Sequence, residues 1–236
     1  MRSRRSLPCV FTALVILWHG IGVGPTPAAD WAMYRGDPER SNYTAETLPG
    51  ELSLAWQHHP GHPPQPAWSG RDTRTPYDRA YQPVVAGGLL LFGSSADCRV
   101  HALDAATGSA RWTFFTGGPV RFAPVVWEDR VLAVSDDGHL YCLAADDGRL
   151  LWKIRGGPGD DMVLGNGRMT SRWPARGGPV VADGVVYFGA GIWPSEGIFV
   201  YAVDARNGEV LWCNDDSGGI YMPQPHGGAN AKSGIS

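Results

Sequence analysis

Short apolar runs separated by glycine-containing turns dominate the chain from about residue 83 onward. Residues 89–92 (LLLF) and 185–188 (VVYF) are apolar at every position rather than at alternate positions. Because successive strand residues point to opposite faces of a sheet, such runs predict strands that are covered on both faces. Turns at 87–88, 96–97 and 107–108 divide the first such region into four strands of about five residues each.

Three segments of the chain repeat one another, at residues 83–112, 124–152 and 179–212. Each opens with Pro-Val-Val and ends in a turn glycine that a tryptophan follows four positions later. Trp112 and Trp152 lie 40 positions apart, which is close to the length of a four-stranded propeller blade. The repeat therefore predicts an all-β fold, a β-propeller of four-stranded antiparallel blades. The blades are expected at 83–115, 124–154 and 179–213.

The predicted blades are too few to close a ring, since closed propellers have about four to eight. An outer strand is expected near 52–57, within an N-terminal segment and polar linker at 30–82. The chain then supplies about three to three and a half blades of a ring of about seven or eight. Residues 214–236 resemble an inter-blade link with no blade after it. We expect the polypeptide to be truncated there; the alternative is that copies associate to complete a ring.

The end of each repeat carries a motif of the form Ala-x-Asp-x-x-Thr-Gly-x-x-x-Trp. It begins at Ala102 and recurs at Ala202 with Asn in place of Thr, whereas the second repeat departs from it at Cys142 and Ala144. The motif resembles the pyrroloquinoline-quinone-type (PQQ-type) repeat. That family includes quinoprotein dehydrogenases, the non-enzymatic propeller lipoprotein of outer-membrane assembly and many exported propellers. Residues 31–36 (WAMYRG) resemble the start of the last group. The resemblance implies that these residues dock successive blades: Gly108, Trp112, Gly148, Trp152, Gly208 and Trp212.

The first 29 residues have the layout of a secretory signal peptide, with a basic start, an apolar stretch and small residues before a cleavage site near Ala28 or Ala29. The apolar stretch is too short to span a membrane as a helix, and a retained anchor is the alternative. Loss of its three arginines moves the formal charge from −3 to about −6. Such a protein has no electrostatic footprint for nucleic acid and no basic amphipathic segment for stable membrane attachment. We expect it to be periplasmic or secreted.

Residues in excess of the repeat locate the candidate site. Trp152 and Trp212 are 60 positions apart, 20 more than the preceding interval. Of these, 15 lie between the second and third blades and 5 lie inside the third blade, around 192–197. In antiparallel blades, inter-blade links emerge on the same face as the loops between second and third strands. Both insertions are therefore predicted on one face, where the blades hold loops that are free to carry function.

The polar residues of these insertions are the candidate ligand-binding residues. We expect a polar pocket at the mouth of the central channel, able to bind an anionic or sugar-like ligand. The alternative is a set of solvated loop residues or partners in loop-ordering salt bridges. Three residues of the tail join the set, His226, Asn230 and Lys232. The main candidates are Asp160, Asp161, Asn166, Arg168, Arg172, Trp193 and Glu196.

Histidines and cysteines are the other residues with candidate chemistry. The cluster of His58, His59 and His62 has a spacing that metal sites use, but no cysteine or acid accompanies it at ligand spacing. We interpret this proline-rich segment as a linker. The cysteines beyond the signal segment are interpreted as small buried apolar residues, and a disulfide between two of them is the alternative. They are Cys98, Cys142 and Cys213.

The sequence favours a non-catalytic binding or scaffolding propeller, because it contains no catalytic motif such as G-x-S-x-G or H-E-x-x-H. No cofactor or metal is expected, and the expected partner is a protein or the remainder of the propeller. The alternative is a fragment of a quinoprotein dehydrogenase with PQQ and calcium on the channel axis. The resemblance implies a vicinal Cys-Cys disulfide and an aspartate base in such enzymes. This sequence has no adjacent cysteines and no aspartate that matches the base. An inert fragment of a longer protein is the third hypothesis.

Overall fold

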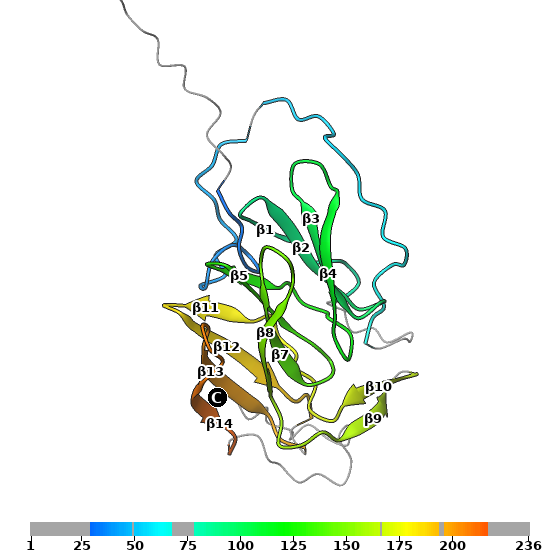
Figure 1. Ribbon diagram of the computed structural model, residues 1–236, viewed down its shortest axis with the longest axis vertical. Coiled ribbons are helices and arrows are strands. Elements are labelled where there is room, and N and C mark those ends of the chain that lie inside the picture. The colour runs from blue at the N-terminus through cyan, green and yellow to red at the C-terminus, as the bar shows by residue number, and fades with distance from the viewer. Residues whose placement is uncertain (1–28, 49, 68–77, 166, 194–195, 217–236) are drawn as a thin grey trace, which may run out of the picture.

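Three four-stranded antiparallel sheets and a separate hairpin form the part of the chain that the computed structural model describes, residues 29–48, 50–67, 78–165, 167–193 and 196–216 (Figure 1). Blade 1 contains β1 (Val84–Ala86), β2 (Leu89–Ser94), β3 (Arg99–Asp104) and β4 (Ala110–Phe115). Blade 2 contains β5 (Val125–Trp127), β6 (Arg130–Val134), β7 (His139–Ala144) and β8 (Leu150–Arg155). Blade 3 contains β11 (Val180–Ala182), β12 (Val185–Ala190), β13 (Phe199–Asp204) and β14 (Val210–Asn214). The strands of each sheet pair in chain order, so the predicted all-β architecture of propeller blades is confirmed.

The apolar cores lie between neighbouring blades. Blade 2 shares one core with blade 1, where Leu91 and Val131 are fully buried, and a second with blade 3, where Leu132 and Val186 are fully buried. Val131 and Leu132 are adjacent in β6 and point to opposite faces of its sheet. Both faces of blade 2 are therefore covered, which explains why its middle strands are apolar at consecutive positions.

The docking glycines each lie against a tryptophan from the preceding repeat. A Cβ added at Gly148 would lie 2.5 Å from the ring of Trp112, and one at Gly208 would lie 2.9 Å from the ring of Trp152. Both glycines have positive φ, 73° and 79°, which L-residues with side chains rarely adopt. The Trp112 indole also donates a hydrogen bond to the carbonyl of Ala145 at 2.8 Å. Successive blades are thus joined at their turns by a ring that packs directly on backbone.

The expected outer strand near 52–57 is wrong, because none of these residues is in a strand. An outer strand forms only by pairing with the third strand of its own sheet, and no described segment pairs with these residues. Trp56 nevertheless takes the docking position on blade 1. Its ring lies 2.5 Å from where a Cβ of Gly108 would be, and its indole donates to the carbonyl of Ala105 at 3.0 Å.

Residues 29–42 cross the inner strands of all three blades. Trp31 pairs with Val85 of β1 through two backbone hydrogen bonds of 2.7 and 3.0 Å. The next residue, Ala32, accepts a hydrogen bond from Val126 of β5 at 2.8 Å, and Arg40 donates to the carbonyl of Gly178 just before β11 at 2.9 Å. This segment ties together the inner strand edges. No helix in the described residues is long and apolar enough to cross a membrane.

The hairpin formed by β9 (Met162–Gly165) and β10 (Arg168–Ser171) was not predicted. It occupies most of the insertion between blades 2 and 3 and lies apart from the three sheets (Figure 1). The chain contains Asn-Gly at 166–167, a pair that favours the tight two-residue turn of a hairpin. Gly167, with φ of 77°, has the backbone conformation that such a turn requires.

Asp137 joins the link before blade 2 to β7. Its carboxylate accepts hydrogen bonds from the Gly117 backbone N–H at 2.7 Å and from the Tyr141 hydroxyl. Burial by itself would raise the pKa of Asp137, but hydrogen bonds from His139 and Tyr141 outweigh it and hold the pKa below its usual value.

Replacing Tyr141 by phenylalanine should lower the free energy of unfolding by about 1 kcal/mol at neutral pH, because Asp137 loses a donor. A carboxyl whose pKa falls on folding contributes stability above its unfolded pKa of about 3.9 and loses that contribution as the pH drops through the folded value. The difference between wild type and Y141F should therefore shrink as the pH falls from about 5 to about 3, as measured by urea unfolding. A difference that is constant over this range would contradict the assignment.

Candidate functional site

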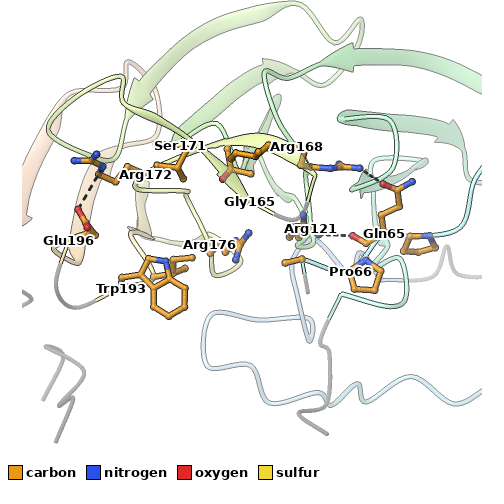
Figure 2. A pocket seen from close by; sticks show the side chains of 16 residues that line it. Gln65, Pro66, Arg121, Gly165, Arg168, Ser171, Arg172, Arg176, Trp193 and Glu196 are labelled. Atoms are coloured by element: carbon orange, nitrogen blue, oxygen red, sulfur yellow. Dashed lines mark hydrogen bonds and ion pairs between the residues drawn. The ribbon is translucent and has the colours of Figure 1, made fainter. Parts of the chain in front are cut away.

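The two insertions meet in one pocket of about 570 Å³. The hairpin β9–β10 forms one wall, and the loop after β12 contributes Ile192, Trp193 and Glu196. The remaining wall comes from the links that lead into the inner strands, including Gln65 before blade 1 and Arg121 before blade 2. Figure 2 shows Trp193, Arg172 and Glu196 at one end of the cavity and Gln65 with Arg168 at the other.

The predicted site residues fall into three groups. Arg168, Arg172, Trp193 and Glu196 line the pocket. Asp160 and Asp161 lie outside the lining and form ion pairs, Asp160 with Arg155 and Asp161 with Arg172 at 3.4 Å. The others lie outside the described residues: Asn166, His226, Asn230 and Lys232.

Arg172 is paired with two carboxylates. Its guanidinium lies 3.4 Å from Asp161 and 3.8 Å from Glu196, and it sits over the ring of Trp173 at 5.7 Å from the centroid. The Trp173 indole in turn donates a hydrogen bond to the backbone carbonyl of Glu196. These contacts order the hairpin base and the loop of blade 3, so this end of the pocket fits the alternative of loop-ordering salt bridges.

Arg168 has different surroundings. Its guanidinium donates to the carbonyl of Ser95 at 2.8 Å and to the side-chain oxygen of Gln65, which are both neutral acceptors. Within the described residues no carboxylate forms an ion pair with it. The Arg168 end of the pocket therefore carries a positive charge that the surrounding residues do not compensate.

A buried ionic network lies beneath the pocket, and sequence reasoning missed it. Asp136 accepts hydrogen bonds from Arg121 at 2.6 Å and from Arg176 at 2.9 Å, while Arg121 also contacts Asp78 at 2.6 Å. The side chains of Arg121 and Asp136 are only 3% and 1% exposed. Two arginines and two aspartates balance in charge, so this network holds the pocket floor rather than adding a net charge to it.

The repeat itself could have revealed the two arginines. Arg121 and Arg176 each stand three positions before the Pro-Val-Val that opens their blade. Equivalent positions of successive blades face the central axis of the propeller. An arginine at the same position in two blades therefore indicates one acidic residue between them that pairs with both. Asp136 follows β6 at the same edge and accepts from both.

The histidine cluster lies against the face of blade 1 that points away from blade 2. His58 packs against Phe92 with ring centroids 5.7 Å apart, and the Tyr81 hydroxyl donates to the carbonyl of His62 at 2.7 Å. His101 stacks on Phe92 at 4.9 Å, and burial lowers its pKa although Asp97 lies 3.0 Å away. In the described part of the chain no three histidine, cysteine or acidic side chains are grouped so that they could hold a metal ion.

The three cysteines in the described part of the chain, Cys98, Cys142 and Cys213, are free thiols. Cys142 is fully buried between blades 2 and 3, and burial raises its pKa to about 12. At neutral pH this group is a protonated, apolar side chain.

The glycine–tryptophan docking and the four-stranded blades define a class of protein, the propellers of PQQ-type repeats. Residues 53–216 match the PQQ_2 family model, described as outer membrane protein assembly factor BamB. The chain belongs to this family.

Relatives of two kinds are similar to this chain. The dehydrogenase subunit of the quinone-type alcohol dehydrogenase of Gluconobacter oxydans (strain 621H) is 27% identical over 202 residues, 78% of this chain and 24% of that protein. The outer membrane protein assembly factor BamB of Yersinia pestis is 29% identical over 155 residues, 60% of this chain and 37% of that protein. The chain thus spans a minor part of the length of both relatives.

Solved structures support the fold. The crystal structure of quinohemoprotein alcohol dehydrogenase from Comamonas testosteroni superposes with a TM-score of 0.59 and 22% sequence identity, over 79% of this chain and 27% of that one. A europium-containing methanol dehydrogenase gives the same TM-score at 19% identity, over 80% of this chain and 32% of that one. At these identities the likeness concerns the arrangement of blades.

Proposed function

We propose that this protein is an exported, non-catalytic binding propeller, periplasmic or secreted, whose pocket holds an anionic ligand. The observation that carries the proposal is Arg168, a guanidinium at a cavity with neutral hydrogen-bond partners only. A charge in a partly enclosed site gains most from a partner of opposite sign, and a planar guanidinium binds carboxylates or phosphates through two parallel hydrogen bonds. The Trp193 ring offers an apolar or sugar-binding surface at the other end.

The scaffolding part of the proposal rests on the face of blade 3 that points away from blade 2. Tyr187 and Trp212 are exposed there, at 44% and 51%. The docking tryptophans Trp112 and Trp152 each lie on the turn glycine of the next blade. A further PQQ-type blade, from the remainder of a propeller or from a protein partner, would cover Trp212 in the same way.

Glucuronate should bind saturably to the whole chain at low salt, and glucose, its neutral counterpart, should bind at least about tenfold more weakly. R168Q should remove this preference, because the guanidinium is replaced by a neutral amide of similar reach. R149Q is the matched control, since Arg149 is an exposed arginine on a distant turn of blade 2. Isothermal titration calorimetry measures all six combinations of the three proteins and the two ligands. Equal affinity of wild type and R168Q for glucuronate would refute the assignment.

A quinone-dependent dehydrogenase is the second candidate, favoured by the alignment of 78% of this chain with a quinone-type alcohol dehydrogenase subunit. The described residues fit PQQ with calcium poorly. The carboxylates at the pocket are Glu196 and, beneath it, Asp78 and Asp136, and arginines already bind all three. Titration with PQQ and calcium, followed by alcohol-dependent dye reduction, separates the candidates: turnover supports the dehydrogenase, and binding without turnover supports the binding propeller.

A further inference from the structure

The two faces of the hairpin β9–β10 differ in character. In its register Gly165 pairs with Arg168 and Val163 pairs with Thr170, and these four residues line the pocket. The alternate side chains project from the opposite face, where Met162, Leu164 and Met169 are 42%, 75% and 52% exposed. Leu164 and Ser171 of this set also reach the rim of the pocket, whereas Met162 and Met169 do not. One face of the hairpin is therefore the pocket wall with its cationic end, and the other is an apolar surface.

The outer edge of β9 has unused backbone hydrogen-bonding groups. In an antiparallel pair, facing residues alternately bond to each other and point their N–H and C=O groups outward. Ser171 points outward, since its N–H donates to the carbonyl of Asp136 at 2.8 Å, and Arg172 donates to Asp161 within the hairpin. The backbone groups of Met162, which lies opposite Ser171, therefore also point outward. Because the pattern alternates, the same holds for Leu164, two residues further along β9. Among the described residues neither has an outward hydrogen-bond partner.

We infer that the anionic ligand is an extended polypeptide segment that adds as a third strand to the outer edge of β9, with acidic and apolar side chains in alternation. An added strand places every second side chain on each face of the sheet. Its acidic side chains then lie on the pocket face, toward Arg168, and its apolar side chains lie beside Met162 and Leu164. The charge of Arg168 thus favours acidic residues at every second position of the bound segment. The exposed apolar face of the hairpin favours apolar residues at the positions between them.

This inference rests on the proposed function, because both require an anion at Arg168. It adds a requirement that a small anion does not have, namely backbone pairing with β9. Two outward residues provide two donors and two acceptors, enough for four main-chain hydrogen bonds in the added strand. A short edge of this kind favours a peptide of moderate affinity rather than a permanent subunit.

The test uses fluorescein-labelled octapeptides and the whole chain, with binding followed by fluorescence anisotropy. A peptide alternating Glu and Val should bind saturably. A peptide with the same residues in two blocks, which cannot separate charge and apolar groups onto opposite faces, should bind at least about tenfold more weakly, and so should one alternating Lys and Val. Equal binding of the alternating and block peptides would overturn the inference.

Two variants at one position isolate the backbone pairing. L164P removes the outward N–H of Leu164 but none of the hairpin's own hydrogen bonds, and proline is tolerated at strand edges. L164A keeps the N–H and removes most of the side chain. L164P should reduce peptide affinity at least about tenfold relative to L164A. Their unfolding midpoints, compared with that of wild type, establish that both are folded, and equal affinities in folded variants would overturn the inference.

Glucuronate distinguishes this inference from the function on which it rests. L164P and L164A should bind glucuronate equally, because both lack the leucine side chain that reaches the pocket and glucuronate does not need the outward N–H. Glucuronate binding together with equal affinities for all peptides would overturn the inference and leave the proposed function standing. If neither glucuronate nor any peptide binds, both are refuted.

Discussion

Replacing Gly148 by alanine should lower the free energy of unfolding by about 3 kcal/mol. Part of this is the backbone, because φ is 73° and a left-handed conformation costs a residue with a Cβ about 1 kcal/mol or more. The rest is steric, because the new methyl would lie 2.5 Å from Cε3 and 2.7 Å from Cδ2 of Trp112, and overpacking of this kind costs about 1–3 kcal/mol. Urea unfolding followed by intrinsic fluorescence measures the loss.

Gly88 supplies the matched control. Its φ of 77° is nearly the same, but a Cβ there meets nothing within 4 Å. G88A should therefore show the backbone contribution alone, about 1 kcal/mol. In addition, G148A and W112F should be coupled, since a smaller ring relieves the contact. Equal losses for G148A and G88A, with no coupling to Trp112, would show that the glycine–tryptophan contact does not hold the blades together.

Replacing Asp136 by asparagine should lower the free energy of unfolding by about 3–5 kcal/mol, the usual consequence of leaving buried charges unpaired. Arg121 and Arg176 both pair with this carboxylate, and Arg121 also pairs with Asp78. The pocket should loosen as well, because both arginines line it. Urea unfolding gives the stability, and glucuronate titration of the same samples gives the effect on the site.

Asp129 is the control for this substitution. It also pairs with an arginine, Arg130, but its side chain is 78% exposed. D129N should change stability by less than about 0.5 kcal/mol, since exposed ion pairs contribute little. A loss for D136N as small as that for D129N would mean that the buried network does not support the fold.

The sequence predicted where the candidate site lies better than it predicted the roles of its residues. The spacing of the repeats located both insertions and led to Arg168, Arg172, Trp193 and Glu196, which the structure places around one pocket. The spacing could not show which of these charged residues lack a partner of opposite charge, because such partners can be distant in sequence. Arg168 reaches Gln65, 103 positions away, whereas Arg172 pairs with Asp161 nearby.

Two further features were present in the sequence and were not used. The Asn-Gly pair at 166–167 indicates the hairpin, and the arginines three positions before Pro124 and Pro179 indicate the buried network. The outer strand near 52–57 shows the opposite case. Its tryptophan fits the repeat and docks on Gly108, yet a strand requires a partner strand, which the apolar pattern of one segment does not reveal.

The sequence by itself determined the blade: its strands, its turns and the glycine–tryptophan pairs that recur in every repeat. These features depend on short-range backbone conformation and on a contact that recurs in every unit. Only the tertiary structure decided which charges are compensated. Asp136 lies 15 positions from Arg121 and 40 from Arg176, and the three side chains meet because successive blades direct their inner strands toward one axis. The same packing leaves Arg168 with neutral partners, and electrostatic character of this kind arises from the assembled blades and not from any one repeat.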